Sequence, residues 1–215
     1  MKLYTYFRSS AAYRVRIALK LKGLQADMLP VHLVNNGGEQ FSEAYSTLNP
    51  QHLVPLLDDD GMLLSQSMAI IEYLDETHPQ VPLLPPDLAG RARVRALSQA
   101  IACDIHPINN LRVLKYLSER LGATAQQKND WYRHWIALGL EALEAQVAQS
   151  PDTGSFCHGD TPTMADCCLV PQLYNARRFE CELSAYPTLV AIAQRCEALI
   201  PFADARPDAQ ADAQA

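Results

Sequence analysis

Residues 6–19 read YFRSSAAYRVRIAL, and this stretch decides the fold because a short apolar strand turns into a helix at two adjacent serines, Ser9 and Ser10. The first amides of a helix have no partners within it, and the helix dipole adds positive charge at the same end. Such a helix start stabilises an anion, for example a phosphate, a carboxylate or a thiolate. The stretch contains no phosphate-cradling glycine run, no cysteine and no histidine. We therefore expect a bound molecule that brings its own nucleophile.

A purely structural role is the alternative for this stretch. Serine is a common N-cap, so Ser10 could do no more than begin the helix. Arg8, Arg14 and Arg16 would then be ordinary surface charges. The rest of the sequence favours the anion site.

The composition excludes several other classes of protein. The chain has 215 residues, of which 48% are hydrophobic and 20% charged, and is long enough for two domains with their own cores. No apolar stretch approaches the ~18 residues of a membrane span, and the segment before Arg8 is too short and polar for a secretory signal. A formal net charge of -6 argues against non-specific nucleic-acid binding. We expect a cytoplasmic protein that binds a small anion, with neither a membrane nor a nucleic-acid partner.

The six cysteines show neither a C-x-x-C pair nor the spacing of metal ligands. Thiols of cytosolic proteins are kept reduced. We therefore expect reduced, mostly buried thiols without disulfides, and no metal site.

The first 80 residues carry strand and helix signals in the order βαβ-α-ββα. The predicted elements are a strand at 2–7, a helix at 11–22, a strand near 28–34, a short helix at 41–48, strands at 54–57 and 62–64, and a helix at 67–77. Gly23 ends the first helix, and the sequence DDDG at 58–61 joins the last two strands as a hairpin. This order predicts a thioredoxin-like α/β domain over residues 1–80, with a four-stranded mixed sheet covered by helices.

A proline-rich connection at 78–87 marks the domain boundary. Beyond it, helical patterns at 91–120, 126–150 and 163–178 predict an all-α domain over residues 88–205. Residues 206–215 are small and polar, and we expect a disordered tail. Thr163 and Asp166 have the spacing of a capping box, which we interpret as a structural cap.

Two further motifs could bind a peptide. Val54-Pro55 lies at the start of a strand, and a cis bond there would leave the Val54 backbone open to pairing with an added strand. Gln66-Ser67 supplies a second helix start, which could bind a carboxylate or could be a plain cap. Two helix starts and a strand-pairing edge suit a γ-glutamyl peptide with a thiol in its middle. We therefore expect glutathione.

Together these motifs resemble the zeta class of the glutathione transferases. The resemblance rests on residues 6–19, Asn49-Pro50 followed by Val54-Pro55, residues 66–74, Gly159-Asp160 followed by residues 163–166, and residues 169–172 and 175–179. It implies the glutathione transferase fold, glutathione as the cofactor and a homodimer.

The resemblance also implies a glutathione-dependent cis-trans isomerase of a maleyl diketo acid, converting maleylacetoacetate to fumarylacetoacetate in the catabolism of aromatic compounds, aromatic amino acids among them. A thiolate that adds reversibly to the double bond permits rotation and then leaves unchanged. Three alternatives stay open: maleylpyruvate isomerisation, general glutathione S-transfer to small electrophiles, and glutathione binding without turnover. Net consumption of glutathione would distinguish the transferase.

For glutathione itself, the resemblance implies that Ser9 donates a hydrogen bond to the sulfur, with Ser10 near the peptide. Val54 would pair with the cysteinyl backbone, and Gln66 and Ser67 would hold the γ-glutamyl end. Further expected glutathione contacts are Gln40, His106 and Asn110.

The expected catalytic residues are Ser9, Ser10 and Arg178. Arg178 is also expected to bind the substrate, and Arg8 and Arg112 are further candidates by position, with surface solvation as the alternative for Arg112. The sequence departs from the family pattern at Ala11, where cysteine is common, and at His106, where glutamine is usual.

The serine hydroxyl and the helix start together are sufficient to activate a thiol. Lowering a thiol pKa from about 8.5 to about 6.5 takes roughly 2.7 kcal/mol. One hydroxyl hydrogen bond to an anion supplies about 1.5–3 kcal/mol, and a helix start about 0.3–1 kcal/mol more. No cysteine of the protein is needed.

Overall fold

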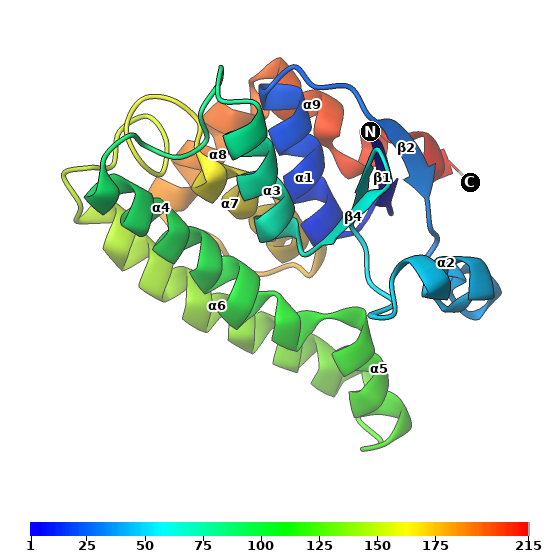
Figure 1. Ribbon diagram of the computed structural model, residues 1–215. Helices are drawn as coiled ribbons and strands as arrows, with labels where there is room; N and C mark the ends of the chain where they lie inside the picture. Colours follow the sequence, from blue (N-terminus) through cyan, green and yellow to red (C-terminus); the bar gives the residue numbers. More distant parts are fainter. Residues whose placement is uncertain (215) are drawn as a thin grey trace. The chain divides into compact units, whose positions relative to one another are not determined.

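The computed structural model describes residues 1–214 and separates into two compact units (Figure 1). The first unit combines Met1–Leu83 with the C-terminal segment that begins at Ala198. The second unit is Leu84–Glu197. The polypeptide therefore returns to its first unit after completing the second.

The first unit contains a four-stranded mixed sheet, as predicted. Its strands are β1 (Lys2–Thr5), β2 (Asp27–Pro30), β3 (Leu56–Asp59) and β4 (Met62–Ser65), in the spatial order β2-β1-β3-β4. β1 pairs with β2 in parallel and with β3 antiparallel, and β3 and β4 form the predicted hairpin. The thioredoxin-like arrangement is confirmed.

The helices of the first unit are α1 (Ser10–Leu21), α2 (Glu43–Leu48), α3 (Ser67–Thr77) and α9 (Ile200–Ala205), with short 3-10 helices at Asn35–Gly37, Glu39–Phe41, Pro207–Ala209 and Ala211–Gln214. α1 contacts both α3 and α9, and Figure 1 shows α1 and α3 side by side next to the sheet. Because neighbours surround it, α1 is buried along its whole middle, residues 12–19.

Two arginines on α1 are buried rather than exposed. Arg14 is 2% and Arg16 1% accessible to solvent. The interpretation of these residues as surface charges is therefore wrong. A guanidinium leaves water only where hydrogen-bond acceptors replace it. Arg16 donates to Thr5, Tyr6, Phe7 and Ala205, and Arg14 Nη1 donates to Ser67 Oγ.

The sequence predicts that the second strand continues to Val34, but the strand ends at Pro30. Pro30 still pairs with Thr5 of β1. His32 Nδ1 then accepts hydrogen bonds from the amides of Val34 and Asn35, at 3.2 and 2.8 Å. These bonds turn the chain into a 3-10 helix instead of extending the strand.

The C-terminal residues also differ from the prediction. The sequence predicts residues 198–205 as the end of the helical domain; by its contacts this segment groups with the first unit, where α9 packs against α1. The composition predicts a disordered tail over 206–215, but Pro207–Ala209 and Ala211–Gln214 form 3-10 helices, and residue 215 lies outside the described residues. A buried hydrogen bond ties them to the sheet unit, because the Phe7 amide donates to Asp212 Oδ2 at 2.9 Å.

The second unit is helical, as predicted. Its helices are α4 (Leu88–Gln99), a π-helical segment (Ala100–Ile105), a 3-10 helix (Pro107–Asn109), α5 (Leu111–Glu119), α6 (Ala125–Ala148), α7 (Met164–Arg178) and α8 (Pro187–Glu197). Among the described residues, no helix combines the length and apolar character needed to cross a membrane.

The single helix expected over 91–120 is interrupted. Gly139 of α6 lies so close to Ile105 that a Cβ at position 139 would be 2.3 Å from that side chain. This close approach coincides with the widened π-helical turn, and Pro107 then lacks the amide that would continue the helix.

Asp166 caps α7 inside the core of the second unit, which confirms the predicted structural cap. Its carboxylate accepts from the Thr163 amide (2.7 Å), the Thr163 hydroxyl (2.8 Å) and the Cys157 amide (2.9 Å). The side chain is fully buried, and this desolvation raises the pKa of Asp166 from its usual range, against the opposing effect of the hydrogen bonds.

Replacing this carboxylate should destabilise the protein strongly. Asp166→Ala leaves the buried amides of Thr163 and Cys157 without an acceptor, and each such group costs about 1–3 kcal/mol, so the free energy of unfolding should fall by about 2–6 kcal/mol. Urea titration followed by circular dichroism measures this. Asp130→Ala, at an exposed position of α6, is the control and should change stability by less than about 0.5 kcal/mol. Equal midpoints for the two variants would contradict the assignment.

Candidate functional site

Ser9, and not Ser10, is the N-cap of α1. The Ser9 Oγ accepts a hydrogen bond from the Ala12 amide at 3.2 Å, and Ser10 is the first, buried residue of the helix. A hydroxyl that accepts one hydrogen bond still carries its own O–H. Ser9 can therefore hold the helix start and donate to an anion at the same time, so the structural and the chemical interpretations are compatible.

The turn that presents Ser9 is held by Arg16. The Arg16 guanidinium donates to Thr5 Oγ1 (3.0 Å), to the Tyr6 carbonyl (3.3 Å) and to the Phe7 carbonyl (3.0 Å). Burial lowers the pKa of Arg16 to about 10, so the group stays charged at neutral pH. A second cation, Arg8, is exposed, with its guanidinium 4.8 Å from the Phe7 ring centroid.

The strand register brings three chain segments to the same end of the sheet. Tyr4 of β1 pairs with Leu56 of β3, and Leu56 pairs with Ser65 of β4. The turn after β1, the Val54-Pro55 step before β3 and the Gln66-Ser67 step after β4 therefore emerge together. The motifs that the sequence separates by about sixty residues meet here.

The Val54-Pro55 peptide bond is cis, and Val54 is buried. The loop before it is anchored at the Leu53 carbonyl, which accepts from the Tyr45 hydroxyl at 2.6 Å and the Asn49 side-chain amide at 2.8 Å. Burial raises the pKa of Tyr45 to about 12, so this hydroxyl remains a donor. The Asn49 side chain thus helps to fix the backbone that leads to Val54.

The start of α3 is positioned by a side chain from α1. Ser67 is buried, and its Oγ accepts a hydrogen bond from Arg14 Nη1 at 3.2 Å. Gln66, directly before it, has a φ of 70°, in the left-handed region that non-glycine residues seldom adopt. Its exposed side chain donates to Gln51 Oε1 at 3.2 Å. Backbone conformations of this kind cluster at ligand sites.

Gln40 lies inside the loop that follows β2. It is 5% exposed, and Gly38 passes so close that a Cβ there would lie 2.7 Å from the Gln40 amide group. The Gln40 Nε2 donates to the Leu33 carbonyl at 3.5 Å, whereas its Oε1 is buried without a hydrogen-bond partner among the described residues. This oxygen is an acceptor that a bound amide could use.

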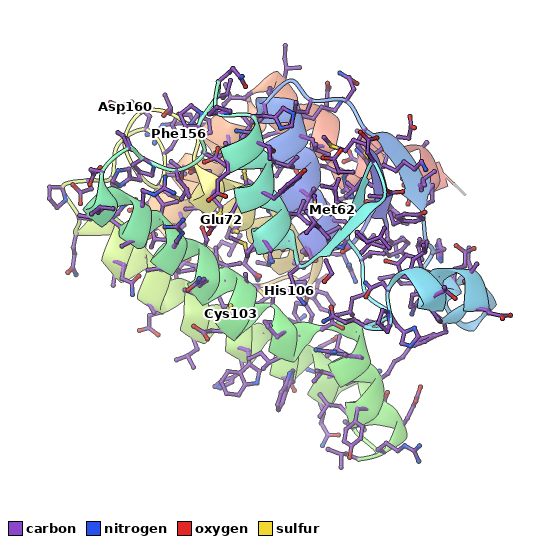
Figure 2. All side chains as sticks on the ribbon, in the orientation of Figure 1. Met62, Glu72, Cys103, His106, Phe156 and Asp160 are labelled. Carbon is purple, nitrogen blue, oxygen red and sulfur yellow. The ribbon has the colours of Figure 1, made fainter. Side chains whose placement is uncertain are left out.

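The remaining predicted residues belong to the second unit. Asn110 is the N-cap of α5, and its side-chain oxygen accepts from the Arg112 amide at 3.1 Å. Arg112 is exposed. His106 is half-buried at the end of the π-helical segment, and Figure 2 labels it together with Cys103 on this stretch.

Arg178 lies at the C-terminal end of α7, exposed, with its guanidinium 4.9 Å from the Phe179 ring centroid. The Phe179 ring stacks on Tyr132 of α6, with centroids 3.6 Å apart. Burial raises the pKa of Tyr132 to about 12, and the positive charge of Arg178 opposes this rise. Asn109 Nδ2 donates to the Tyr132 carbonyl at 3.4 Å, so Tyr132 links the segment 106–112 with the end of α7.

Sequence reasoning missed these supporting residues. Tyr132 and Asn109 lie in helical patterns that predict core or surface positions and nothing more. Phe179 belongs to the motif at 175–179, but nothing in the sequence indicates its stacking on Tyr132. Arg14 and Arg16 stand within the motif quoted first, but their charge suggested exposure. Asp212 lies in a segment whose composition predicted disorder.

The cysteines of the protein are not suited to nucleophilic chemistry. None of the six, all within the described residues, forms a disulfide, and Cys157, Cys167, Cys168 and Cys196 are buried. Desolvation raises the pKa of the Cys157, Cys167 and Cys196 thiols, so these groups stay protonated at neutral pH. Within residues 1–214 no group of three or more histidine, cysteine or acidic side chains could hold a metal ion.

Known proteins of one family are similar to this chain in sequence and in structure. Residues 8–77 match the family model described as glutathione S-transferase, N-terminal domain, and residues 130–206 match the glutathione S-transferase, C-terminal domain. The chain is 52% identical to a probable maleylacetoacetate isomerase of Vibrio cholerae, over 98% of this chain and 97% of that protein.

Two solved structures are similar over nearly the full length. One is the holo structure of a maleyl pyruvate isomerase, described as a bacterial zeta-class glutathione S-transferase, with a TM-score of 0.96, 48% identity and 99% of both chains covered. The other is a maleylacetoacetate isomerase of Methylobacterium extorquens AM1 with bound malonate and glutathione, with a TM-score of 0.94, 40% identity and 98% of both chains covered.

Proposed function

This chain belongs to the glutathione S-transferase family, in its zeta class, and from that premise we propose that it is a glutathione-dependent isomerase converting maleylacetoacetate from the cis to the trans form. The observation that carries the proposal is the meeting of the Ser9 cap, the Val54-Pro55 step and the Gln66-Ser67 helix start at one end of the sheet. The product would be fumarylacetoacetate, in the catabolism of aromatic compounds.

The residues at this end of the sheet suit glutathione in three respects. Ser9 keeps an O–H to donate to a sulfur anion, and the adjoining helix start and buried Arg16 add positive charge. The start of α3 offers amides to a carboxylate, with Arg14 beside it. Gln40 Oε1 is a buried acceptor without a partner in the described chain. When bound, glutathione would supply a thiolate that adds reversibly to the double bond of the substrate.

The roles of the protein residues follow from these positions. Ser9 would donate to the sulfur, with the buried Ser10 beside the peptide, and Val54 would pair with the peptide backbone. Gln66 and Ser67 would hold the γ-glutamyl end, with further contacts from Gln40, His106 and Asn110. Arg178 would bind a carboxylate or the oxygen on which negative charge develops, and Arg8 and Arg112 would add cationic charge for the substrate.

Maleylpyruvate is the second candidate substrate. The similarity to a maleyl pyruvate isomerase structure, at a TM-score of 0.96, supports maleylpyruvate as a substrate. Both acids present carboxylates next to a cis double bond, so the same arginines would serve either one. We place the protein in the cytoplasm, with no membrane or nucleic-acid partner.

Ser9→Ala should lower the turnover number by about 10- to 200-fold, because about 1.5–3 kcal/mol of thiolate stabilisation is lost. Ser9→Thr retains a hydroxyl on the same helix start and should keep most of the activity. Ser10→Ala should cost less than Ser9→Ala. Steady-state isomerisation of maleylacetoacetate measures all three, with circular dichroism to verify folding. Near-wild-type turnover of folded Ser9→Ala would show that another group stabilises the sulfur.

The arginine at the end of α7 gives the most specific test of the activity. Arg178→Ala should raise KM and lower kcat for both maleyl acids, because a charge-assisted contact to the substrate is lost. Arg177→Ala is the matched control, since Arg177 is exposed on the same turn and pairs with Glu197. Glutathione should not be consumed. Efficient conjugation of a neutral aryl halide, with both maleyl acids left in the cis form, would replace the isomerase by a general transferase.

We also propose a homodimer. The edge strand β4 exposes Met62 (42%) and Leu63 (40%), and Figure 2 shows Met62 on this strand. An exposed apolar edge is a surface that proteins normally cover. Sedimentation velocity should give twice the chain mass of 23.9 kDa at micromolar concentration. A species of the single-chain mass would refute the dimer.

A further inference from the structure

The backbone between β1 and α1 depends on a residue from the other end of the chain. The amide of Phe7 donates to Asp212 Oδ2 at 2.9 Å, in a buried position and across 205 residues of sequence. Asp212 is 9% exposed, although Asp208, Ala209 and Ala211 of the same C-terminal segment are exposed. An isolated acidic side chain is seldom buried unless it has a specific partner.

Phe7 is held at both of its backbone polar groups, the N–H and the carbonyl. Asp212 accepts from its N–H, and Arg16 Nη2 donates to its carbonyl at 3.0 Å. The same guanidinium also reaches the C-terminal part of the chain, because Arg16 Nε donates to the Ala205 carbonyl at 3.1 Å. Arg16 and Asp212 are of opposite charge, so each offsets part of the cost of burying the other. Two residues farther along the chain from Phe7, Ser9 caps the start of α1.

The packing around Asp212 is open on one side. Asp212 and Thr5 line a cavity of about 250 Å³, together with Met28 of β2, Lys20 of α1 and Gln210 of the C-terminal segment. Pro207 of this segment is buried and Ala213 packs against the hydrophobic core of the first unit, and the Asp212–Phe7 hydrogen bond adds a polar anchor. If the Asp212 carboxylate were removed, the adjoining cavity would give water a route to the Phe7 amide.

We propose that Asp212 is a positioning residue for catalysis, which fixes the Ser9 turn through the Phe7 amide. The inference rests on the proposed function, in which the Ser9 hydroxyl donates to the glutathione sulfur and must therefore be positioned accurately. If the Ser9 hydroxyl is displaced by a fraction of an ångström, it loses part of its effect on the sulfur, while the other contacts between the protein and glutathione persist. Loss of the Asp212 contact should therefore lower kcat more than it weakens glutathione binding.

The test compares three full-length variants. Asp212→Ala removes the acceptor, and Asp212→Asn keeps an oxygen that can accept from the Phe7 amide. Asp208→Ala is the matched control, since Asp208 is an exposed acid in the same segment, paired with Arg206. For each variant we would measure kcat, KM for glutathione, Tm, and amide hydrogen exchange over residues 6–10.

We expect Asp212→Ala to lower kcat by about tenfold with KM for glutathione within about twofold of wild type, and to speed exchange of the Phe7 amide. Asp212→Asn should restore most of the lost turnover, and Asp208→Ala should match wild type. A folded Asp212→Ala variant with wild-type kcat would overturn the proposal. An Asp212→Asn variant as impaired as Asp212→Ala would also overturn it, because charge and not the Phe7 contact would then be decisive.

The Phe7 amide of the unmodified protein provides a test that needs no variant. Slow exchange at this turn amide, comparable with the middle of α1, supports the contact, and fast exchange refutes it even if Asp212→Ala does not fold. The two proposals also fail separately. A wild-type protein without isomerase turnover refutes the proposed function, whereas an active wild type with an unprotected Phe7 amide refutes only the role of Asp212.

Discussion

The buried guanidinium of Arg16 is the interaction on which the rest of the site depends. At 1% exposure it has exchanged water for the carbonyls of Tyr6, Phe7 and Ala205 and the Thr5 hydroxyl. A charge this deep is tolerated only where acceptors surround it. The turn therefore has to bring its carbonyls inward to Arg16, and this arrangement places Ser9 at the start of α1. Arg14, half a turn away on the same helix, donates to Ser67 at the start of α3.

This arrangement explains how the protein can activate a thiol without contributing one. The thiols of Cys157, Cys167 and Cys196 have pKa values raised by burial, and Ala11 stands where the family commonly has cysteine. What the chain offers is a helix start, a hydroxyl with a free O–H and buried positive charge. Each of these stabilises an anion brought from outside, and together they suit a cofactor that enters with its own sulfur.

Much of this could be predicted from sequence, and the exceptions share a physical cause. The order of strands and helices, the bounds of α3 and the Asp166 cap follow from local patterns of apolar and capping residues. Burial of Arg16 and ordering of Asp212 do not, because each depends on a partner far away in the chain: Ala205 for one, Phe7 for the other. The interruption of the 91–120 helix likewise arises where Gly139 meets Ile105. Local composition contains no information about such long-range contacts.

The proposed function requires the protein to lower the pKa of a bound glutathione thiol by preferential stabilisation of the thiolate. The ultraviolet absorbance of the thiolate, titrated against pH in the wild-type complex, measures this most directly. We expect the bound thiol to ionise with a pKa about two units below the ~8.5 of a free thiol. A bound thiol that ionises near 8.5 would contradict the claim, because the helix start, the Ser9 hydroxyl and the buried arginines would then contribute nothing to activation.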